Sequence, residues 1–151
     1  MQELSLYAHS MGQNAHHLVF RTKYNLKFFR QELLRDACEL FLRGAAQKHG
    51  MKIHSIKILP DHVHILLEIP PTLSITEATR LLKGHTSRKF FQRFTIWRGI
   101  IKVGHKKAHL WSRWRFSRSV GNVNAGIIEN YINNSSHNQF VAYKSRQTKL
   151  A

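Results

Sequence analysis

Two histidines spaced two residues apart, His62 and His64, are the clearest chemical feature of this chain. They lie in residues 60–69 (PDHVHILLEI), which alternate polar and apolar and then run apolar, as in a strand buried on at least one face. Residues two apart on a strand point to the same face, so the imidazoles are expected side by side, where neutral ring nitrogens can share one divalent cation. Two ligands would leave positions open for a third protein ligand and a substrate oxygen. The alternative is a strand that carries two ordinary surface histidines.

Tyr131 is the second residue whose type could support a reaction. A phenol can attack a phosphodiester when a metal ion polarises a non-bridging oxygen, and it then holds the 5′ phosphate as an ester while a 3′-OH is released. Because that ester keeps the bond energy, the strand ends could be rejoined without ATP. The alternative is a core or surface tyrosine, which is the more common role of a helical tyrosine.

The charge of the chain predicts a polyanionic partner. The 151 residues include 24 Lys and Arg against 8 Asp and Glu, a formal charge of +16, and nucleic acid is the usual partner of so basic a protein. No acidic residue occurs between Glu77 and Glu129, although half of the basic residues lie there. Aromatic residues are interleaved with them and could stack on unpaired bases; the alternative is a solvated basic helix over a core of ordinary aromatics. The aromatics are Phe90, Phe91, Phe94, Trp97, Trp111, Trp114 and Phe116.

The remaining composition indicates a soluble cytoplasmic protein with no membrane partner. The apolar content of 42% suits one core, so we expect a single domain over residues 1–151. The one cysteine, Cys38, excludes an internal disulfide framework and favours a reducing compartment. The apolar runs are too short for a membrane span, and the start lacks the order of a secretion signal.

Hydrophobic periodicity predicts the order strand, helix, strand, strand, helix, strand. This order is typical of an α+β, ferredoxin-like (RRM-like) sandwich, an antiparallel sheet with two helices on one face, here followed by a C-terminal helix that carries Tyr131. In the second helix, Gly84 interrupts the interior, which indicates that something approaches the backbone closely there. The expected segments are a loose leader 1–13, strand 16–22, helix 31–49, strand 51–59 with one slip, strand 60–69, a helix opened by Ser74 and carrying 78–94, a loop or short irregular elements over 95–109, strand 110–120, a helix capped by Asn124, and a basic tail 141–151.

A set of short motifs runs in order through the chain. They are 17–20 (HLVF), 22–24 (TKY), 60–67 (PDHVHILL), 82–88 (LKGHTSR), 110–112 (LWS), 119–123 (SVGNV) and 131–132 (YI). Any one of them is weak, but the ordered set resembles the single-tyrosine (Y1) HUH transposases of the IS200/IS605 insertion-sequence family, in which HUH is histidine, hydrophobic, histidine. The resemblance spans residues 16–137.

That resemblance implies a DNA transposase that works as a homodimer on single-stranded DNA, in the cytoplasm of a prokaryote and associated with the nucleoid. It implies that His62 and His64 bind Mg²⁺ or Mn²⁺ and that Tyr131 forms the 5′-phosphotyrosine, with the histidine pair of one subunit completed by the tyrosine helix of the other. It further implies that the basic block grips hairpins near the ends of the element. Lys83 and Arg88 are the first candidates for DNA contact, and Arg80 is the next.

One position departs from the pattern of the family. Its members usually carry Gln or Asn one helical turn after the tyrosine as the third metal ligand, and here that residue is Ser135. Serine is a poor ligand for a hard cation. Asn134 and Asn138 lie on nearly the same helix face as the tyrosine, and His137 is close by. Either a neighbour substitutes, or water fills the place, or this copy is impaired; we favour Asn134 or Asn138 and expect the metal to be held loosely. Two other functions stay open: a non-catalytic or domesticated hairpin DNA- or RNA-binding relative, and a metal-dependent nuclease in which water attacks.

Overall fold

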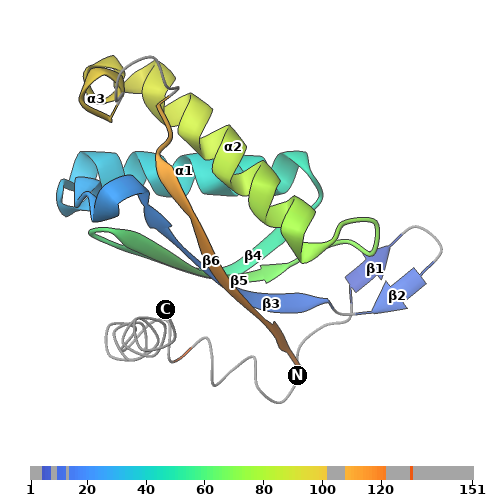
Figure 1. Ribbon diagram of the computed structural model, residues 1–151. Coiled ribbons are helices and arrows are strands. Elements are labelled where there is room, and N and C mark those ends of the chain that lie inside the picture. Colours follow the sequence, from blue (N-terminus) through green and yellow to red (C-terminus); the bar gives the residue numbers. More distant parts are fainter. Residues whose placement is uncertain (1–4, 8–9, 13, 102–107, 122–129, 131–151) are drawn as a thin grey trace.

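The centre of the molecule is an antiparallel sheet with helices on one side. The computed structural model describes residues 5–7, 10–12, 14–101, 108–121 and 130. The four strands have the order β4-β5-β3-β6, and α1 and α2 lie together against the same side of the sheet (Figure 1). This is the split βαβ plan, so the predicted fold class is confirmed. The elements are β3 (Ala15–Thr22), α1 (Glu32–Lys48), β4 (Lys52–Leu59), β5 (His62–Glu68), α2 (Ile75–Arg93) and β6 (Trp111–Val120).

The alternation of side chains along the two central strands gives the sheet two different faces. Leu18 and Phe20 of β3 and Val63, Ile65 and Leu67 of β5 belong to the main core, together with the buried residues of α1 and α2. The residues between them point to the other side of the sheet, as the two-residue period of a strand requires. We call this second side, with His17, Val19, His62 and His64, the histidine face.

The ends of the two long helices follow from local sequence. Gly50 adopts φ 69° after α1, and the amides of Gly50 and Met51 donate to the carbonyls of Gln47 and Ala46 at 3.3 and 2.8 Å. These two bonds form a Schellman motif, which places glycine where a side chain would be strained. At the start of α2 the Ser74 hydroxyl accepts from the amide of Glu77 at 3.1 Å, so the predicted N-cap is confirmed.

A set of polar contacts fastens α2 to the edge strand β6. The indole nitrogen of Trp111 donates to the Thr86 hydroxyl at 2.8 Å, and both groups are buried. The Lys83 ammonium donates to the carbonyls of Ser112 and Trp114, each at 3.0 Å. In this region the register of β6 against β3 shifts between Phe20 and Thr22, so Lys83 satisfies carbonyls of an irregular stretch of strand.

Two segments predicted as irregular contain regular structure. The predicted leader includes a small hairpin of β1 (Ser5–Tyr7) and β2 (Ser10–Gly12), and the predicted loop 95–109 begins with α3 (Thr95–Ile101). Three-residue strands and a seven-residue helix are too short to show a period in the sequence, which explains both errors. Short 3-10 helices η1 (Lys23–Asn25) and η2 (Phe28–Arg30) follow β3. None of the described helices is long and apolar enough to cross a membrane.

The predicted slip in the second sheet strand is confirmed. Ile53 pairs with Leu67 and Ser55 with Leu66, so His54 is an extra residue in β4. The predicted C-terminal helix and basic tail lie outside the described residues, apart from the single helical residue Asn130.

Replacing Thr86 by valine is expected to destabilise the fold. Valine keeps the shape of threonine but leaves the buried indole N–H of Trp111 without its acceptor, which costs about 1–3 kcal/mol. Urea unfolding should show this loss, whereas Thr72→Val, at an exposed position, should change the free energy of unfolding little. Equal stability of the Thr86 and Thr72 variants would contradict the importance of this contact.

Candidate active site

His62 and His64 lie side by side on β5, as the sequence predicted. Their ring centroids are 5.2 Å apart with the planes inclined at 67°. Both belong to the histidine face, and their exposed fractions are only 1% and 2%. Two ordinary surface histidines would be exposed to solvent, so that alternative does not describe this pair.

The Nδ1 atom of each imidazole is engaged by a neighbour. Nδ1 of His62 donates to the Asp61 carboxylate at 2.7 Å, and Nδ1 of His64 lies 3.1 Å from Nε2 of His17. With the proton on Nδ1, the lone pair of each ring is on Nε2, which is the atom that can bind a metal. For His62 the carboxylate fixes this tautomer; for His64 it results when His17 accepts.

His17 is a member of the site that the sequence did not single out. It lies on β3, where it pairs with Leu66 while Val19 pairs with His64, so its ring is a diagonal neighbour of His64. The rings of His17 and His64 stack at 5.4 Å and 18°, and Phe116 of β6 meets His17 edge-on at 5.9 Å. The signal that could have found it is the register of an antiparallel pair, which requires knowing which strands are neighbours.

His17, His62 and His64 form what we call the histidine cluster. Burial keeps His17 and His64 uncharged near neutral pH. It lowers the pKa of His64 to about 3, with further contributions from His17, His62 and Lys57. It also lowers the pKa of His17 to about 4, with a smaller contribution from the Arg118 guanidinium. Neutral imidazoles are the form that binds a metal, so the donor set fits a divalent ion.

Three cross-strand neighbours of the cluster are cationic. Lys57 pairs with His64, Arg21 with His62, and Arg118 with His17. The Arg21 guanidinium also lies over the Trp114 ring, 5.3 Å from its centroid. Three cations around neutral imidazoles favour an anion such as a phosphodiester on this face. Arg21 and Lys57 lie outside the basic block that the sequence emphasised.

Within the part of the chain that the structure describes, no three His, Cys, Asp or Glu side chains form a complete metal site. The buried acid of β5, Glu68, pairs with His54 at 2.8 Å. The predicted nucleophile Tyr131, the candidate ligands Asn134 and Asn138, and Ser135 lie outside the described residues.

The three predicted DNA contacts differ in their surroundings. Arg80 and Arg88 are exposed on α2, whereas the Lys83 ammonium is bound to the β6 carbonyls and lies 5.5 Å from the centroid of the Phe20 ring. Burial and the nearby Arg115 lower the pKa of Lys83 to about 8. These contacts assign Lys83 a structural part in joining α2 to β6.

Most aromatics of the basic block are in the core and cannot stack on bases. Phe90, Phe91 and Trp111 are buried, and Phe94 and Trp97 pack against the same cluster. Trp114 and Phe116 are half-buried on β6, next to Arg21 and His17. They remain the two candidates for stacking on the histidine face.

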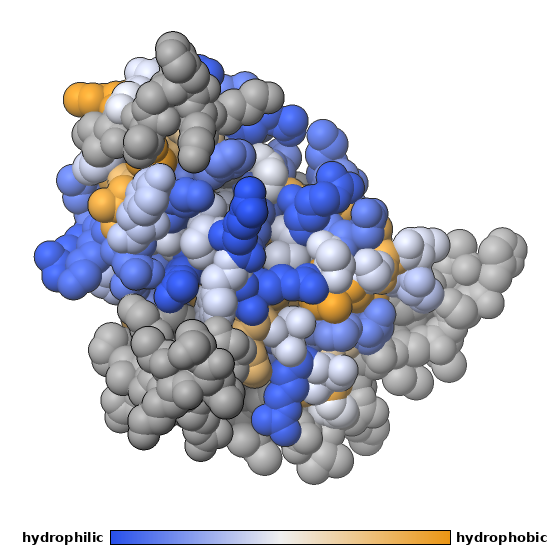
Figure 2. All heavy atoms as spheres, viewed as in Figure 1, coloured by the Kyte–Doolittle hydropathy of each residue, from blue (hydrophilic) through white to orange (hydrophobic). Residues whose placement is uncertain are grey.

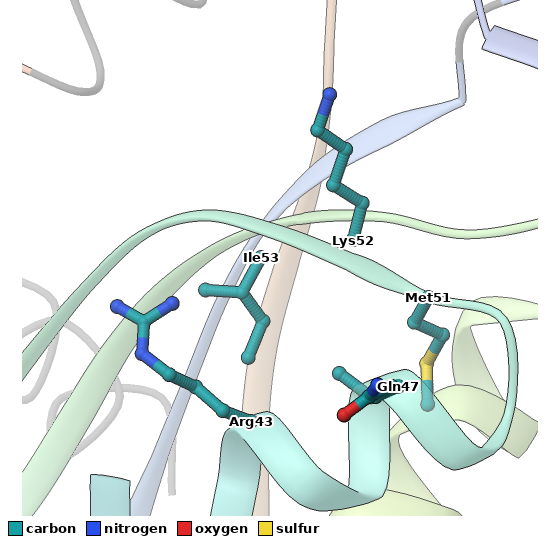
Figure 3. A pocket seen from close by; sticks show the side chains of 6 residues that line it. Arg43, Gln47, Met51, Lys52 and Ile53 are labelled. Atoms are coloured by element: carbon teal, nitrogen blue, oxygen red, sulfur yellow. The ribbon is translucent and has the colours of Figure 1, made fainter. Parts of the chain in front are cut away.

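A shallow pocket lies between the end of α1 and the start of β4, apart from the histidine cluster (Figure 3). It is lined by Arg43, Ala46, Gln47, Met51, Lys52 and Ile53. Arg43 is held by Glu39 at 3.0 Å, and the lining offers neither a nucleophile nor a metal ligand. The chemistry of the molecule is therefore assigned to the histidine face.

Comparison with known proteins identifies the class. Residues 10–135 match the family model "Transposase IS200 like". The chain is 31% identical over 125 residues to the transposase of insertion sequence element IS200 from Salmonella typhimurium, covering 83% of this chain and 78% of that protein. It is 32% identical over 79 residues to the ISDra2 transposase TnpA of Deinococcus radiodurans, covering 52% of this chain and 56% of the relative. The chain therefore belongs to the IS200-like transposase family, an enzyme family.

Solved structures share the fold. A crystal structure from Deinococcus radiodurans R1, assigned as a transposase, superposes with a TM-score of 0.63 at 27% identity and covers 89% of this chain and 97% of that one. A REP-associated tyrosine transposase bound to a REP hairpin gives a TM-score of 0.52 at 15% identity, with coverages of 87% and 70%. The four-stranded sheet with its helices is thus an arrangement found in solved transposases.

Acidification is expected to destabilise the metal-free protein through His17 and His64. Because both pKa values lie below the value of about 6.5 for an unfolded histidine, the unfolded chain binds more protons as the pH falls below that value, and stability is lost toward about pH 4. The free energy of unfolding should fall by up to about 1.4 kcal/mol per pH unit for each histidine.

Urea unfolding in EDTA between about pH 7 and pH 4.5 measures this dependence. In the His17→Leu variant, the slope of the free energy of unfolding against pH should fall by the amount that corresponds to about one bound proton. An unchanged slope in that variant would contradict a neutral buried His17.

Proposed function

We propose that this transposase cleaves and rejoins single-stranded DNA at insertion-sequence ends through a 5′-phosphotyrosine on Tyr131, with Mg²⁺ or Mn²⁺ held by His62 and His64. The observation that carries the proposal is the pair of buried imidazoles on β5, each with its Nδ1 engaged. Such a pair presents two Nε2 lone pairs from one rigid strand. Rigid placement of ligands on a strand is what a metal-dependent reaction requires.

The donor set suits an ion that must also bind substrate. Two imidazoles leave several coordination positions for phosphate oxygens and water. When bound, the ion polarises the scissile phosphate and offsets the charge of the incoming phenolate. Asp61 holds the ring of His62, and His17 holds that of His64, so neither ring has to reorient when the substrate arrives.

In the proposed step, the phenolic oxygen of Tyr131 attacks the phosphorus and the bond to the 3′ oxygen breaks. The phenol loses its proton, and the departing 3′ oxygen takes one up to become a 3′-OH. The 5′ phosphate stays on Tyr131 as an ester, and attack by another 3′-OH reverses the step and joins new ends. Water attack would instead give hydrolysed product without a covalent protein–DNA species.

The cations of the histidine face would position the strand. Arg21, Lys57 and Arg118 are the cross-strand neighbours of the cluster, and they can contact phosphates on either side of the scissile one. Trp114 and Phe116, on the same face, offer rings to adjacent unpaired bases. This arrangement supports a single strand as the substrate, because paired bases could not stack on them.

The remaining parts of the site are proposed from the family pattern. Asn134 or Asn138 would supply the third ligand that Ser135 cannot, and the protein would act as a homodimer in which the tyrosine helix of one subunit completes the histidine pair of the other. The hairpin in the REP-associated relative supports hairpin DNA as a partner here too. Arg80 and Arg88, exposed on α2, are the proposed contacts to it.

The covalent adduct is the direct test of this mechanism. Wild type incubated with a single-stranded oligonucleotide of the element's end and Mg²⁺ should give an adduct that shifts on denaturing gels. Tyr131→Phe and His64→Ala should abolish it, whereas Tyr143→Phe should not. Adduct formation by Tyr131→Phe would reject Tyr131 as the nucleophile. If wild type binds hairpins but forms no adduct, the protein is a non-catalytic DNA-binding relative.

Arg88 and Lys83 should respond differently to mutation. Arg88→Ala removes an exposed cation, so it should weaken hairpin binding and lower the slope of log K against log salt by about 1, with unchanged stability. Lys83→Met leaves two carbonyls of β6 without their donor, so it should cost about 1–3 kcal/mol of stability. Fluorescence anisotropy and urea unfolding measure the two effects, and a Lys83→Met protein as stable as wild type would contradict the structural role.

A further inference from the structure

Two leucines are exposed on the outer side of α1. Among the described residues, the large hydrophobic side chains exposed to solvent are Tyr24, Leu33, Leu40 and Ile96. Leu33 and Leu40 are 64% and 68% exposed, and they lie two turns apart on the same helix. A single exposed leucine needs no explanation, but two leucines on one line of one helix form a hydrophobic surface.

Small residues continue this line along the helix. Ala37 is half-buried and Gly44 is exposed. Positions 33, 37, 40 and 44 follow the alternating four- and three-residue spacing that keeps side chains on one side of a helix. We call Leu33, Ala37, Leu40 and Gly44 the α1 stripe. The buried residues of α1 lie on its other side; they are Leu34, Cys38, Leu42, Ala45 and Ala46.

The charge of α1 favours a second copy of this chain over nucleic acid as the partner of the stripe. The helix carries three acidic and three basic residues in a chain of charge +16. On the neighbouring α2, by contrast, Glu77 is the single acidic residue against five Lys and Arg, and hydrophilic side chains dominate the surface over that helix (Figure 2). A polyanion gains nothing from a neutral helix, whereas two strongly basic chains repel each other least where neither has a net charge.

The exposed charges of α1 are arranged so that the helix complements itself. Glu32 and Asp36 lie in its first half, and Arg43 and Lys48 lie in its second half. An antiparallel copy of the helix therefore brings acidic residues against basic ones, whereas a parallel copy brings like charges together. Arg43 also pairs with Glu39 at 3.0 Å, but its side chain is 50% exposed, and its five N–H donors leave room for a second carboxylate.

We propose that the α1 stripe is a contact between two copies of this chain, with their α1 helices antiparallel about a two-fold axis. With the axis at the midpoint of the stripe, each Leu33 faces the partner's Gly44 and each Leu40 faces the partner's Ala37. A large side chain thus lies over a small residue at every position, as in closely packed helix pairs.

The contact is independent of the proposed function. Helix α1 lies on the side of the sheet opposite to the histidine face (Figure 1), so the contact leaves that face open to DNA and to a tyrosine helix. It joins two single chains into a dimer or, where chains already pair through the tyrosine helix, two dimers into a tetramer. In both cases the mass of the assembly doubles.

Sedimentation velocity of the full chain over a range of concentrations tests the contact. Because the surface is small, we expect a dissociation constant on the order of 10 µM. Leu33→Glu and Leu40→Glu each put a carboxylate on the stripe and should weaken association at least tenfold. Ile96→Glu is the matched control, because Ile96 is 74% exposed but lies on α3, and this variant should associate like wild type.

Urea unfolding of the dissociated proteins separates loss of the contact from loss of the fold. Leucine and glutamate have similar helix propensities, and both leucines are exposed. Leu33→Glu and Leu40→Glu should therefore unfold at the same urea midpoint as wild type.

A charge swap tests the antiparallel geometry. In the proposed pair, Asp36 lies beside the partner's Arg43 along the flank of the stripe. Asp36→Arg alone sets cations against each other and should weaken association about fivefold, because the two-fold axis repeats the pair. Asp36→Arg combined with Arg43→Asp restores the complementarity and should recover the association of wild type.

Two results would overturn the proposal. They are a wild-type protein whose mass equals that of Leu40→Glu at every concentration up to about 0.2 mM, and a loss of association in Ile96→Glu as large as that in Leu40→Glu. A double charge variant that associates as weakly as Asp36→Arg would reject the antiparallel arrangement.

Discussion

The pairing of β3 with β5 is the constraint on which the rest of the site depends. Its register sets Val19 opposite His64 and His17 two pairs further along, opposite Leu66, which brings Nε2 of His17 to 3.1 Å from Nδ1 of His64. A slip of one residue would turn every one of these side chains into the core. The same register buries Leu18, Phe20 and Ile65 against the helices, so the apolar core and the histidine cluster are fixed by one set of strand pairs.

The edge strand β6 connects the two surfaces that we assign to DNA. On one side of the sheet, Phe116 reaches the histidine cluster; on the other, Lys83 of α2 binds the carbonyls of Ser112 and Trp114. The guanidinium of Arg115 adds a bond of 2.8 Å to the Thr76 hydroxyl at the start of α2. Polar contacts hold α2 and the histidine face at a fixed separation, which suits the proposed function, in which hairpin DNA is bound and a single strand is cleaved.

Local signals in the sequence were enough to predict the long helices and the strands of the sheet. The three- and four-residue spacing of α1, the cap at Ser74 and the alternation around His62 each express a geometry of the backbone alone. They led to the order of elements and to the histidine pair. Short elements such as α3 carry too few residues for a period, and they were assigned as loops.

The site residues that the sequence did not reveal are those that pairing between distant strands brings to the histidine face. His17, Arg21 and Lys57 join the site through strand neighbours, which no local pattern encodes. Lys83 was predicted from the family resemblance to contact DNA, and the sequence did not reveal that its ammonium also binds two carbonyls of an irregular strand edge. Charge counts identify the class of partner, whereas only packing decides which cations are available to it.

The most direct test of the central claim is a measurement of the ligands of bound Mn²⁺. Pulsed electron paramagnetic resonance of the protein with Mn²⁺ should show coupling to two imidazole nitrogens, reduced to one in His64→Ala, and replacing Asp61 by asparagine should weaken Mn²⁺ binding by about 10- to 100-fold. Mn²⁺ bound without any imidazole coupling, or with coupling unchanged in His64→Ala, would contradict the account.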